Sequence, residues 1–428
     1  MIALLAVGML FVIGAIAAIA IDVVTFYTAR SEAQLAADSA ALTAARVLAN
    51  SGLTSTVGPI TEEGVATTVA QQVATQDYVG GRALRTSEVT VTYNDTVSSF
   101  ATDPHVTVTV KRTDLPTFFA RILGTTQITV AASATAEAYN PSGANTLLGG
   151  PATPVAPLCV KPWLLPNVDP TVVAGSPMFT AATGAIYTNV VGESWPNTSP
   201  NGNGSGLYSV CPIGSTCTGS LPGTLPNPAA GRYYPAAMDG PPDFFAPTQA
   251  LPACDTSFTP YQSAIAGCVQ QPISCGVNSS TNPSAFNVDT SDYGNRDGET
   301  VVAAECLIHY NGAGDSDSID GAPPFSPPFQ FIEGNQNPVV AAQGQPTMVS
   351  DSIVTIPVID ISSLPLTNPV NVIGFLQVFL NPQSSAMPSN NQIPVTIINM
   401  AGCGNTATGT PILGNGASPV AVRLITPP

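Results

Sequence analysis

Two short acidic stretches of the chain carry side chains that could bind a hard cation. The first, DSDSIDG at residues 315–321, contains Asp315, Asp317 and Asp320. The second contains Asp289, Asp292, Asn295, Asp297 and Glu299. Calcium prefers oxygen ligands, but neither stretch has EF-hand spacing, because placing Gly298 at the invariant glycine puts Tyr293 at the first ligand position. We therefore predict solvated turns with no metal or cofactor. Calcium at either stretch is the alternative, with Asp315, Asp317 and Asp320 as the candidate ligands.

The sequence gives little support for nucleophilic or acid–base catalysis. The chain has two histidines, His105 in an alternating stretch and His309 in an apolar run. GNGSG at residues 202–206 is not a nucleophile elbow, because Ser205 follows Gly204 directly. The sequence contains neither an HExxH motif nor a P-loop lysine motif. A triad assembled in space could still use either histidine, but we predict that the protein is not an enzyme.

The cysteines indicate disulfide bonds. They are Cys159, Cys211, Cys217, Cys254, Cys268, Cys275, Cys306 and Cys403. An even count, absent from the first 158 residues, is typical of a disulfide-bonded region in an oxidising compartment. The close pairs are too widely spaced for a CxxC zinc knuckle, and a chain with two histidines offers zinc few other ligands. Pairing between neighbours, Cys211–Cys217 and Cys268–Cys275, is one hypothesis, and the connectivity stays open.

The overall composition points outside the cytoplasm. At 428 residues the chain is longer than one ordinary compact domain. Charged residues make up 9%, against about a quarter in a typical soluble protein, while there are 41 prolines and 37 glycines. This composition is typical of a β-rich or loop-rich extracytoplasmic protein. The net charge of −16 disfavours binding to nucleic acid, which requires a basic surface.

Residues 1–21 form an uncharged apolar run. As a helix the run is about 30 Å long, enough to cross the core of a bilayer. A cleaved signal peptide is the alternative, but that needs a basic start, a shorter apolar core and a small-residue cleavage site. We predict an uncleaved anchor, with Asp22 marking the membrane interface. Pairing of Asp22 with a basic residue on a partner helix is the alternative. The cysteines then place the rest of the chain on the oxidising side.

Alanines recur after the apolar run with the spacing of one helix face. This i, i+4 row consists of Ala29, Ala33, Ala37, Ala41, Ala45 and Ala49, and the opposite polar row consists of Arg30, Gln34, Asp38 and Arg46. Small side chains let another element approach the helix backbone closely, so we predict that the row docks on the chain's own sheet or on a partner helix. The partner-binding candidates are Ala29, Ala33, Ala37, Ala41 and Ala45. A plain stalk is the alternative, since alanine is the best helix former.

The pattern of the remaining chain predicts an α+β fold. A second helix is expected after Pro59, and alternation predicts antiparallel strands at 87–93, 105–111 and 126–138, with a short helix at 115–124. Later apolar runs, IVTIPVID, VNVIGFLQVFL, IPVTIINM and VAVRLI, predict further strands. We divide the chain into an anchor (1–21), a small α+β domain (22–140), a Pro/Gly linker (141–158) and a β/loop-rich, disulfide-bonded domain (159–428).

The first 140 residues resemble the TadE/TadG-like proteins of Flp (tight-adherence) pilus assembly. The resemblance lies in three stretches in this order: an apolar run leading into AIDVVTFYTARSEAQLAADSAALTAA, then VTVTVKRTDLPTFFARILG, then ITVAASATAEA. Two features depart from the family. No Glu stands five residues after Gly14, as a prepilin peptidase site would have, and DSDSIDG places Asp317 where the DxSxS metal motif of larger members has its first Ser.

The resemblance implies a non-enzymatic envelope protein. It would have one helix in the bacterial cytoplasmic membrane and its body in the periplasm or outside the cell. It would take part in pilus biogenesis or surface adherence, with the membrane and other pilus-assembly or envelope proteins as partners. The alternative is an adhesin-like or ligand-binding surface protein on a generic anchor, suggested by the long polar region with cysteines.

Overall fold

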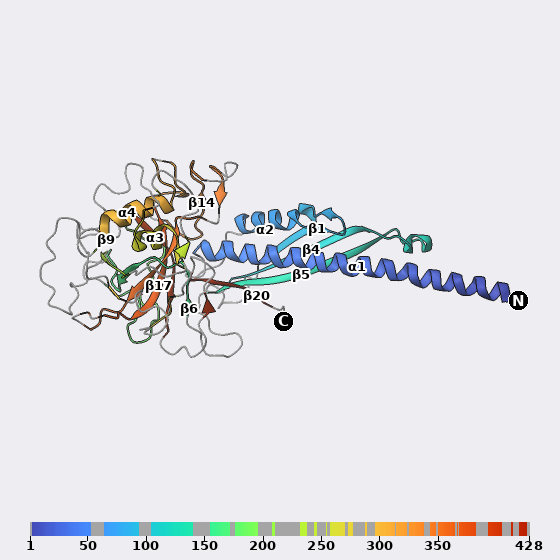
Figure 1. The fold of residues 1–428 in the computed structure, drawn as a ribbon, viewed down its shortest axis with the longest axis horizontal. Coiled ribbons are helices and arrows are strands. Elements are labelled where there is room, and N and C mark those ends of the chain that lie inside the picture. Colours follow the sequence, from blue (N-terminus) through green and yellow to red (C-terminus); the bar gives the residue numbers. More distant parts are fainter. Residues whose placement is uncertain are drawn as a thin grey trace.

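The structure is a computed structural model of the 428-residue chain. It describes residues 2–52, 64–93, 104–139, 155–171, 176–195, 208–209, 232–237, 244–245, 254, 257–269, 273–276, 287–288, 296–312, 314–322, 325–337, 343–347, 350–363, 366, 368–381, 393–404, 412–413 and 419–425. An elongated N-terminal unit leads into a wider body (Figure 1). We use "N-terminal unit" for the described residues up to 139 together with 419–425, and "body" for those from 155 to 413.

The N-terminal unit is built on one long helix. This helix, α1, spans Ile2–Asn50, and at 1.5 Å per residue it is about 74 Å long. Its alanine-rich sequence contains no proline, so no backbone hydrogen bond is lost along it. Gly52 follows it with φ +81°, the left-handed conformation that commonly ends a helix. The amino-terminal part of α1 extends beyond the rest of the molecule (Figure 1).

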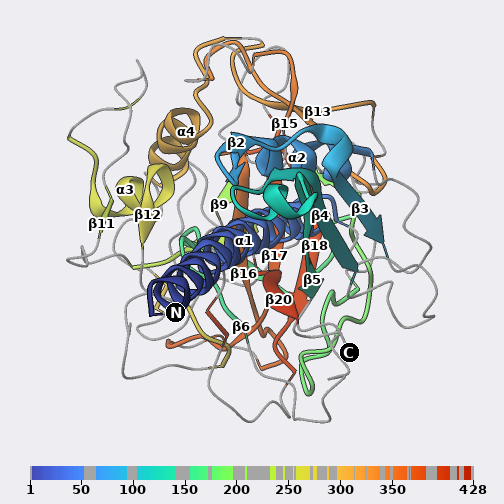
Figure 2. The same cartoon turned by 90° about the vertical axis from the view of Figure 1, so that its right-hand side faces the viewer.

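A four-stranded antiparallel sheet lies beside α1. Its strands, in the order β20-β5-β4-β3, are β20 (Ala421–Ile425), β5 (Gln127–Tyr139), β4 (His105–Pro116) and β3 (Val89–Tyr93). Helix α1 and helix α2 (Gly64–Gln76) pack on one face of this sheet (Figure 2). The alternation predicted for the first three strands is confirmed: Val106, Val108 and Val110 are buried against the helices.

One predicted element differs from the sequence expectation. The stretch 115–124 is not a short α-helix. Leu115 pairs with Ile128 and Pro116 pairs with Gln127, so β4 continues through the proline. Only then does a single 3-10 turn, η3 (Ala120–Leu123), form, and it is followed by Gly124 at φ +93°. Strand pairing therefore overrides the helical pattern of this stretch, which becomes the β4–β5 connection.

The body is centred on a seven-stranded mixed sheet. In spatial order its strands are β8 (Ser194–Trp195), β18 (Val395–Gly402), β17 (Val372–Leu380), β16 (Ile353–Ile359), β7 (Trp163–Pro166), β10 (Arg232–Pro235) and β9 (Tyr208–Ser209). Every residue of β16, β17 and β18 is buried, which explains their continuous apolar sequences. Helices α3 (Pro260–Ala266) and α4 (Arg296–Leu307) share a hydrophobic core with this sheet.

Shorter elements complete the fold. They are β1 (Tyr78–Val79), β2 (Arg82–Ala83), η2 (Thr86–Glu88), β6 (Val155–Ala156), β11 (Phe244–Phe245), β12 (Cys268–Val269), β13 (Ser318–Ile319), β14 (Phe331–Ile332), β15 (Pro346–Thr347) and β19 (Ile412–Leu413). Strands β13, β14 and β15 form a small sheet of their own, and the other strands pair in twos.

Three disulfides bind distant parts of the body together. They are Cys159–Cys268, Cys254–Cys306 and Cys275–Cys403, which join residues 109, 52 and 128 positions apart. The hypothesis of a neighbouring Cys268–Cys275 pair is therefore wrong. Residue 159 lies beside β12, where its N–H donates to Val269, whereas Gly276 bridges to β17, next to β18. Cys211 and Cys217 lie outside the described residues.

The last strand returns to the first sheet. β20 pairs with β5 from Ala421↔Tyr139 to Ile425↔Thr135. The sequence assigned this strand to the domain 159–428, and the domain boundaries themselves stay a prediction. In the structure, the body is inserted between two adjacent strands of the N-terminal unit.

Candidate functional site

The alanine row of α1 lies in the core of the N-terminal unit. Its members, Ala29, Ala33, Ala37, Ala41 and Ala45, are all 0% exposed. They belong to one hydrophobic cluster with buried residues of α2, β4 and β5. The alanine row was predicted to dock either on the chain's own sheet or on a partner helix, and in the structure it packs on the chain's own sheet. These alanines therefore offer no exposed surface to a partner, because the sheet already covers them.

The amino-terminal part of α1 is apolar and uncovered. Ile16 is 63% exposed and Val24 is 64% exposed. Among the described residues, α1 alone is both long and apolar enough to cross a membrane, with a mean hydropathy of 2.0 in its most apolar part. Exposed apolar surface on this scale is costly in water. The helix is thus a membrane-span candidate by length and composition.

Asp22, predicted to mark the membrane interface, also clamps the β4–β5 connection to α1. Its carboxylate accepts hydrogen bonds from three consecutive backbone N–H groups, those of Phe118 (2.8 Å), Phe119 (3.0 Å) and Ala120 (2.6 Å). These groups open the η3 turn and have no partner within it. Sequence analysis missed this role because the partners lie almost 100 residues away along the chain.

A groove lies between α1 and the clamped connection. It has a volume of about 840 Å³, and α1 lines one wall with Gly14, Ala15, Ala18 and Ile19. The facing wall includes Thr117, Phe119, Ile122 and Ile128. Apart from Asp22 and Thr117 the lining is almost entirely apolar. The groove is thus suited to hydrocarbon rather than to a polar substrate.

The sequence of the apolar helix and of most of the alanine row that continues it is similar to a known family. Residues 1–47 match the family model of Flp pilus-assembly TadE/G-like proteins. The match covers the anchor and most of the alanine row, and we call residues 1–47 the TadE/G-like segment. No curated protein and no solved structure matches the chain.

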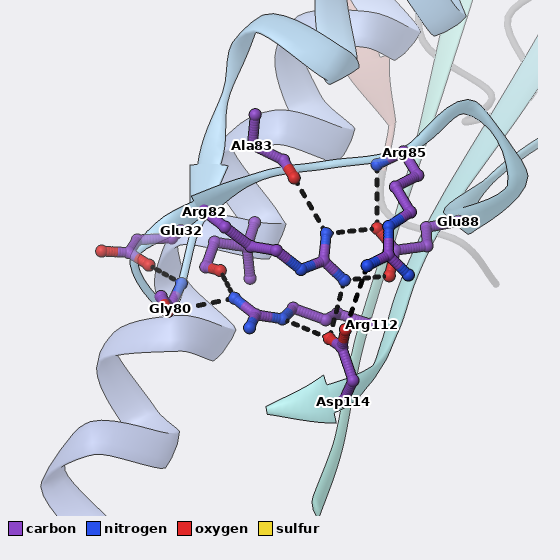
Figure 3. A network of polar contacts seen from close by, with 9 residues as sticks. Glu32, Gly80, Arg82, Ala83, Arg85, Glu88, Arg112 and Asp114 are labelled. Carbon is purple, nitrogen blue, oxygen red and sulfur yellow. Dashed lines mark hydrogen bonds and ion pairs between the residues drawn. The ribbon is translucent and has the colours of Figure 1, made fainter. Parts of the chain in front are cut away.

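An ion-pair network lies beside the TadE/G-like segment (Figure 3). Arg82 donates to Glu88 (2.5 Å) and to Asp114 (2.6 Å), while Arg112 donates to the same Asp114 oxygen (2.8 Å). The hydrogen bond from Arg82, followed by the one from Arg112, lowers the pKa of Asp114 to about 2. The network ties the β1–β2 hairpin and η2 to β4.

Gly80, in the turn between β1 and β2, brings this network onto α1. Its N–H donates to Glu32 of the TadE/G-like segment at 2.6 Å, as Figure 3 shows. A Cβ at this position would lie 2.2 Å from Leu115 and 3.6 Å from the Cβ of Ala29, and φ is +58°. The turn therefore needs glycine here, and Ala29 is the member of the alanine row that lies beneath it.

The carboxyl end of α1 is capped by the body. Asn399 of β18 donates its side-chain amide to the carbonyl of Ala49 (2.5 Å) and to Gln377 of β17 (2.6 Å). The N–H of Phe329 donates to the carbonyl of Ser51 (2.9 Å). The last carbonyls of a helix lack hydrogen-bond donors within the helix, and here residues of the body supply those donors. Asn399 and Gln377 are almost completely buried, and we call these contacts the junction.

Each histidine has an ion-pair partner. His105 Nε2 lies 3.1 Å from Glu137 on β5, and Glu137 also accepts from Arg423 on β20. Burial alone would raise the pKa of Glu137, but the hydrogen bonds from His105 and Arg423 lower it. His309 lies 3.0 Å from Asp351, and that hydrogen bond raises the pKa of His309.

The three calcium candidates occupy different environments. Asp317 is buried and accepts from the N–H of Gly334 (2.8 Å) and from Ser350 (2.5 Å). Asp315 is half-buried and Asp320 is exposed. In the described part of the chain, no group of three or more His, Cys, Asp or Glu side chains could hold a metal ion. Of the second acidic stretch, Asp297 and Glu299 lie on α4, and Asp289, Asp292 and Asn295 lie outside the described residues.

Lys161 is a buried cation of the body that sequence analysis did not single out. Its ammonium group donates to the carbonyls of Ile265 (2.6 Å) and Gly267 (2.8 Å), where α3 ends. Complete burial lowers its pKa to about 7. The ammonium group lies at the carboxyl end of α3, where the helix dipole favours a positive charge. Its two hydrogen bonds connect α3 to the start of β7.

Proposed function

We propose that the chain is a non-enzymatic, membrane-anchored envelope component of a Tad/Flp-type pilus assembly system. The match of residues 1–47 to TadE/G-like proteins carries this proposal. The exposed apolar helix supports membrane anchoring, because the described part of the chain leaves its surface uncovered. The protein would act in pilus biogenesis or surface adherence.

We further propose a single-pass topology in a bacterial cytoplasmic membrane, with the body in the periplasm or outside the cell. Three disulfides support the oxidising side for the body. Other pilus-assembly or envelope proteins would be the partners, and the net charge of −16 speaks against nucleic acid.

The N-terminal unit would hold the body at a fixed distance from the membrane. From Asp22 to Asn50 α1 runs for about 42 Å, and the sheet covers its alanine row over most of that length. The junction then joins the helix end directly to β17 and β18. A continuous helix supported on one side by a sheet bends less than a helix alone, so the unit would work as a spacer.

Deletion of the gene tests the proposal, with complementation by the full chain. Loss of surface pili, counted by electron microscopy, and loss of adherence are expected, and both should return with the complementing chain. Normal piliation and adherence in the deletion strain would overturn the proposal.

The adhesin-like alternative is tested in a strain that lacks the pilin subunit. If this protein binds surfaces by itself, its overproduction there should restore adherence. The full chain is needed in this experiment, because removing residues 1–149 would take β5 away from β20 and the end of α1 away from the junction. Adherence that stays at background supports the assembly role.

A further inference from the structure

The connection between β4 and β5 ends in an exposed apolar tip. Phe118 is 60% exposed, Phe119 is 37% exposed and Ile122 is 80% exposed. Arg121, between them, is exposed as well. We call Phe118, Phe119, Arg121 and Ile122 the apolar tip. Three large apolar side chains around one cation form the combination that amphipathic segments use at a lipid surface.

The clamp by Asp22 fixes the height of the tip along α1. Three consecutive backbone N–H groups of the connection donate to this one carboxylate. The uncharged run before it, residues 1–21, is about 30 Å long as a helix, which equals the thickness of a bilayer core. If that run spans the membrane, Asp22 and the tip lie where hydrocarbon meets headgroups. The connection also lies on the side of the N-terminal unit that faces away from the body (Figure 1).

The groove between α1 and the tip supports the same location. Its walls are apolar on both sides, from Ala15 and Ile19 to Phe119 and Ile122. The groove is continuous with the exposed surface of the apolar helix, so the lipid that surrounds the helix would also fill it. Aromatic side chains are favoured at this depth, and arginine can reach lipid phosphates from it.

We infer that the apolar tip is a second membrane contact, which inserts into the lipid interface beside the point where α1 leaves the bilayer. This inference rests on the membrane anchoring in the proposed function and adds a contact to it. One helix alone could tilt and rotate freely. With the tip inserted as well, the N-terminal unit meets the membrane at two points and its direction is set.

Depth-dependent quenching of tryptophan fluorescence tests the inference on the full chain in phospholipid vesicles. Three single variants are compared, each at an exposed position: Val12→Trp, Phe118→Trp and Tyr78→Trp. Val12 lies ten residues before Asp22, about 15 Å deeper. Tyr78 follows Asp77, which hydrogen-bonds Ser39, about 26 Å along α1 in the other direction. The native Trp163 and Trp195 are buried in the body, and the unmodified chain gives their background.

Lipids carrying bromine near the headgroup or near the end of the acyl chain serve as quenchers. Phe118→Trp should be quenched more strongly by the shallow bromines, Val12→Trp more strongly by the deep ones, and Tyr78→Trp by neither. Adding Asp22→Ala should reduce the quenching of Phe118→Trp and leave that of Val12→Trp unchanged, because only the tip is released.

The pattern separates failure of this inference from failure of the proposed function. Quenching of Val12→Trp without quenching of Phe118→Trp overturns the inference and leaves the anchor intact. Absence of quenching at both positions overturns membrane anchoring itself. A Phe118→Trp emission that is blue-shifted, unquenched and dependent on protein concentration would instead place a second copy of the chain on the tip, and would also overturn the inference.

Discussion

The N-terminal unit and the body solve the problem of stability by different means. The N-terminal unit buries small side chains, with nine α1 alanines among its fully buried residues, and adds an ion-pair network. The body buries large ones, including Trp163, Tyr233 and Phe375, and adds three disulfides. A thin unit cannot bury much area per residue, so it depends on close approach between backbones. The wider body depends on links between distant segments.

The largest effect should come from removing the disulfide with the longest loop. Replacing both Cys275 and Cys403 by Ser should destabilise the body by about 2–5 kcal/mol, because the bond closes the unfolded chain over 128 residues. Hydrogen exchange of β16–β18 amides would measure this. Removing Cys254–Cys306, which spans 52 residues, should cost less. Equal protection before and after the double change would contradict the prediction.

The N-terminal unit should be sensitive to side-chain size instead. Ala37→Leu adds three carbons to a position that is 0% exposed, so we expect a loss of about 1–3 kcal/mol from overpacking. Ser31→Leu, on the exposed side of the same helix, is the matched control and should change stability by less than about 0.5 kcal/mol. Thermal unfolding followed by circular dichroism compares the two. Similar midpoints would mean that α1 does not pack closely on its sheet.

The two regions should separate when the junction is weakened. Asn399→Ala leaves the carbonyl of Ala49 and the amide oxygen of Gln377 without this donor in a buried place, which should cost about 1–3 kcal/mol. Faster hydrogen exchange is expected at the end of α1 and in β18 together. Gln343→Ala removes a half-buried amide that donates to the carbonyls of Asn335 and Asn337 and not to the junction, so it should leave both unchanged. Faster exchange in β18 alone would show that the junction does not couple the two regions.

The body should become less stable as pH rises, because of the buried carboxyl group of Glu333. Burial, together with the charge of Asp317, raises the pKa of Glu333 from 4.5 to about 7. Between those pH values the folded body keeps a proton that the unfolded chain has lost, so stability falls as pH rises through this range. Glu333→Gln should flatten the fall. Hydrogen exchange of β14 at pH 5 and 7 would measure it, and a variant as pH-sensitive as the unmodified chain would refute it.

The smallest effect is a pH dependence of the opposite sign, in the N-terminal unit, whose stability should fall as pH falls. Hydrogen bonds from Arg82 and Arg112 lower the pKa of Asp114 from 3.8 to about 2. This contribution to stability is complete above the unfolded pKa and is lost as pH falls from about 4 to about 2. Asp114→Asn should make the β1–β2 hairpin less stable at neutral pH and less sensitive to acid. Acid titration followed by circular dichroism checks this. An unchanged acid transition would mean that the network contributes nothing measurable.

The same contrast explains what could be predicted from the sequence. The alanine row, the alternating strands and the turn at Gly52 are local patterns, and all of them are present in the structure. The stretch 115–124 was mispredicted because its strand partners, Gln127 and Ile128, compete with a local helical pattern. Local periodicity contains no information about such a competition.

The contacts that matter most to the candidate site are distant in sequence. Asp22 reaches residues 118–120, and Asn399 reaches Ala49. No spacing rule relates such residues, and the same holds for the disulfide partners. An acidic residue at the edge of an apolar run was a usable signal for Asp22, but it could not identify the partner.

The pairing of β20 with β5 has a mechanical consequence. Both strands connect to the body at the same end of the pair, where Ala421 lies opposite Tyr139. A force that pulls the body away from the membrane would draw β20 lengthwise along β5. All five residue pairs would then resist together instead of opening one after another. The strand geometry thus loads the sheet in shear, the direction in which a short β-ladder withstands the greatest tension.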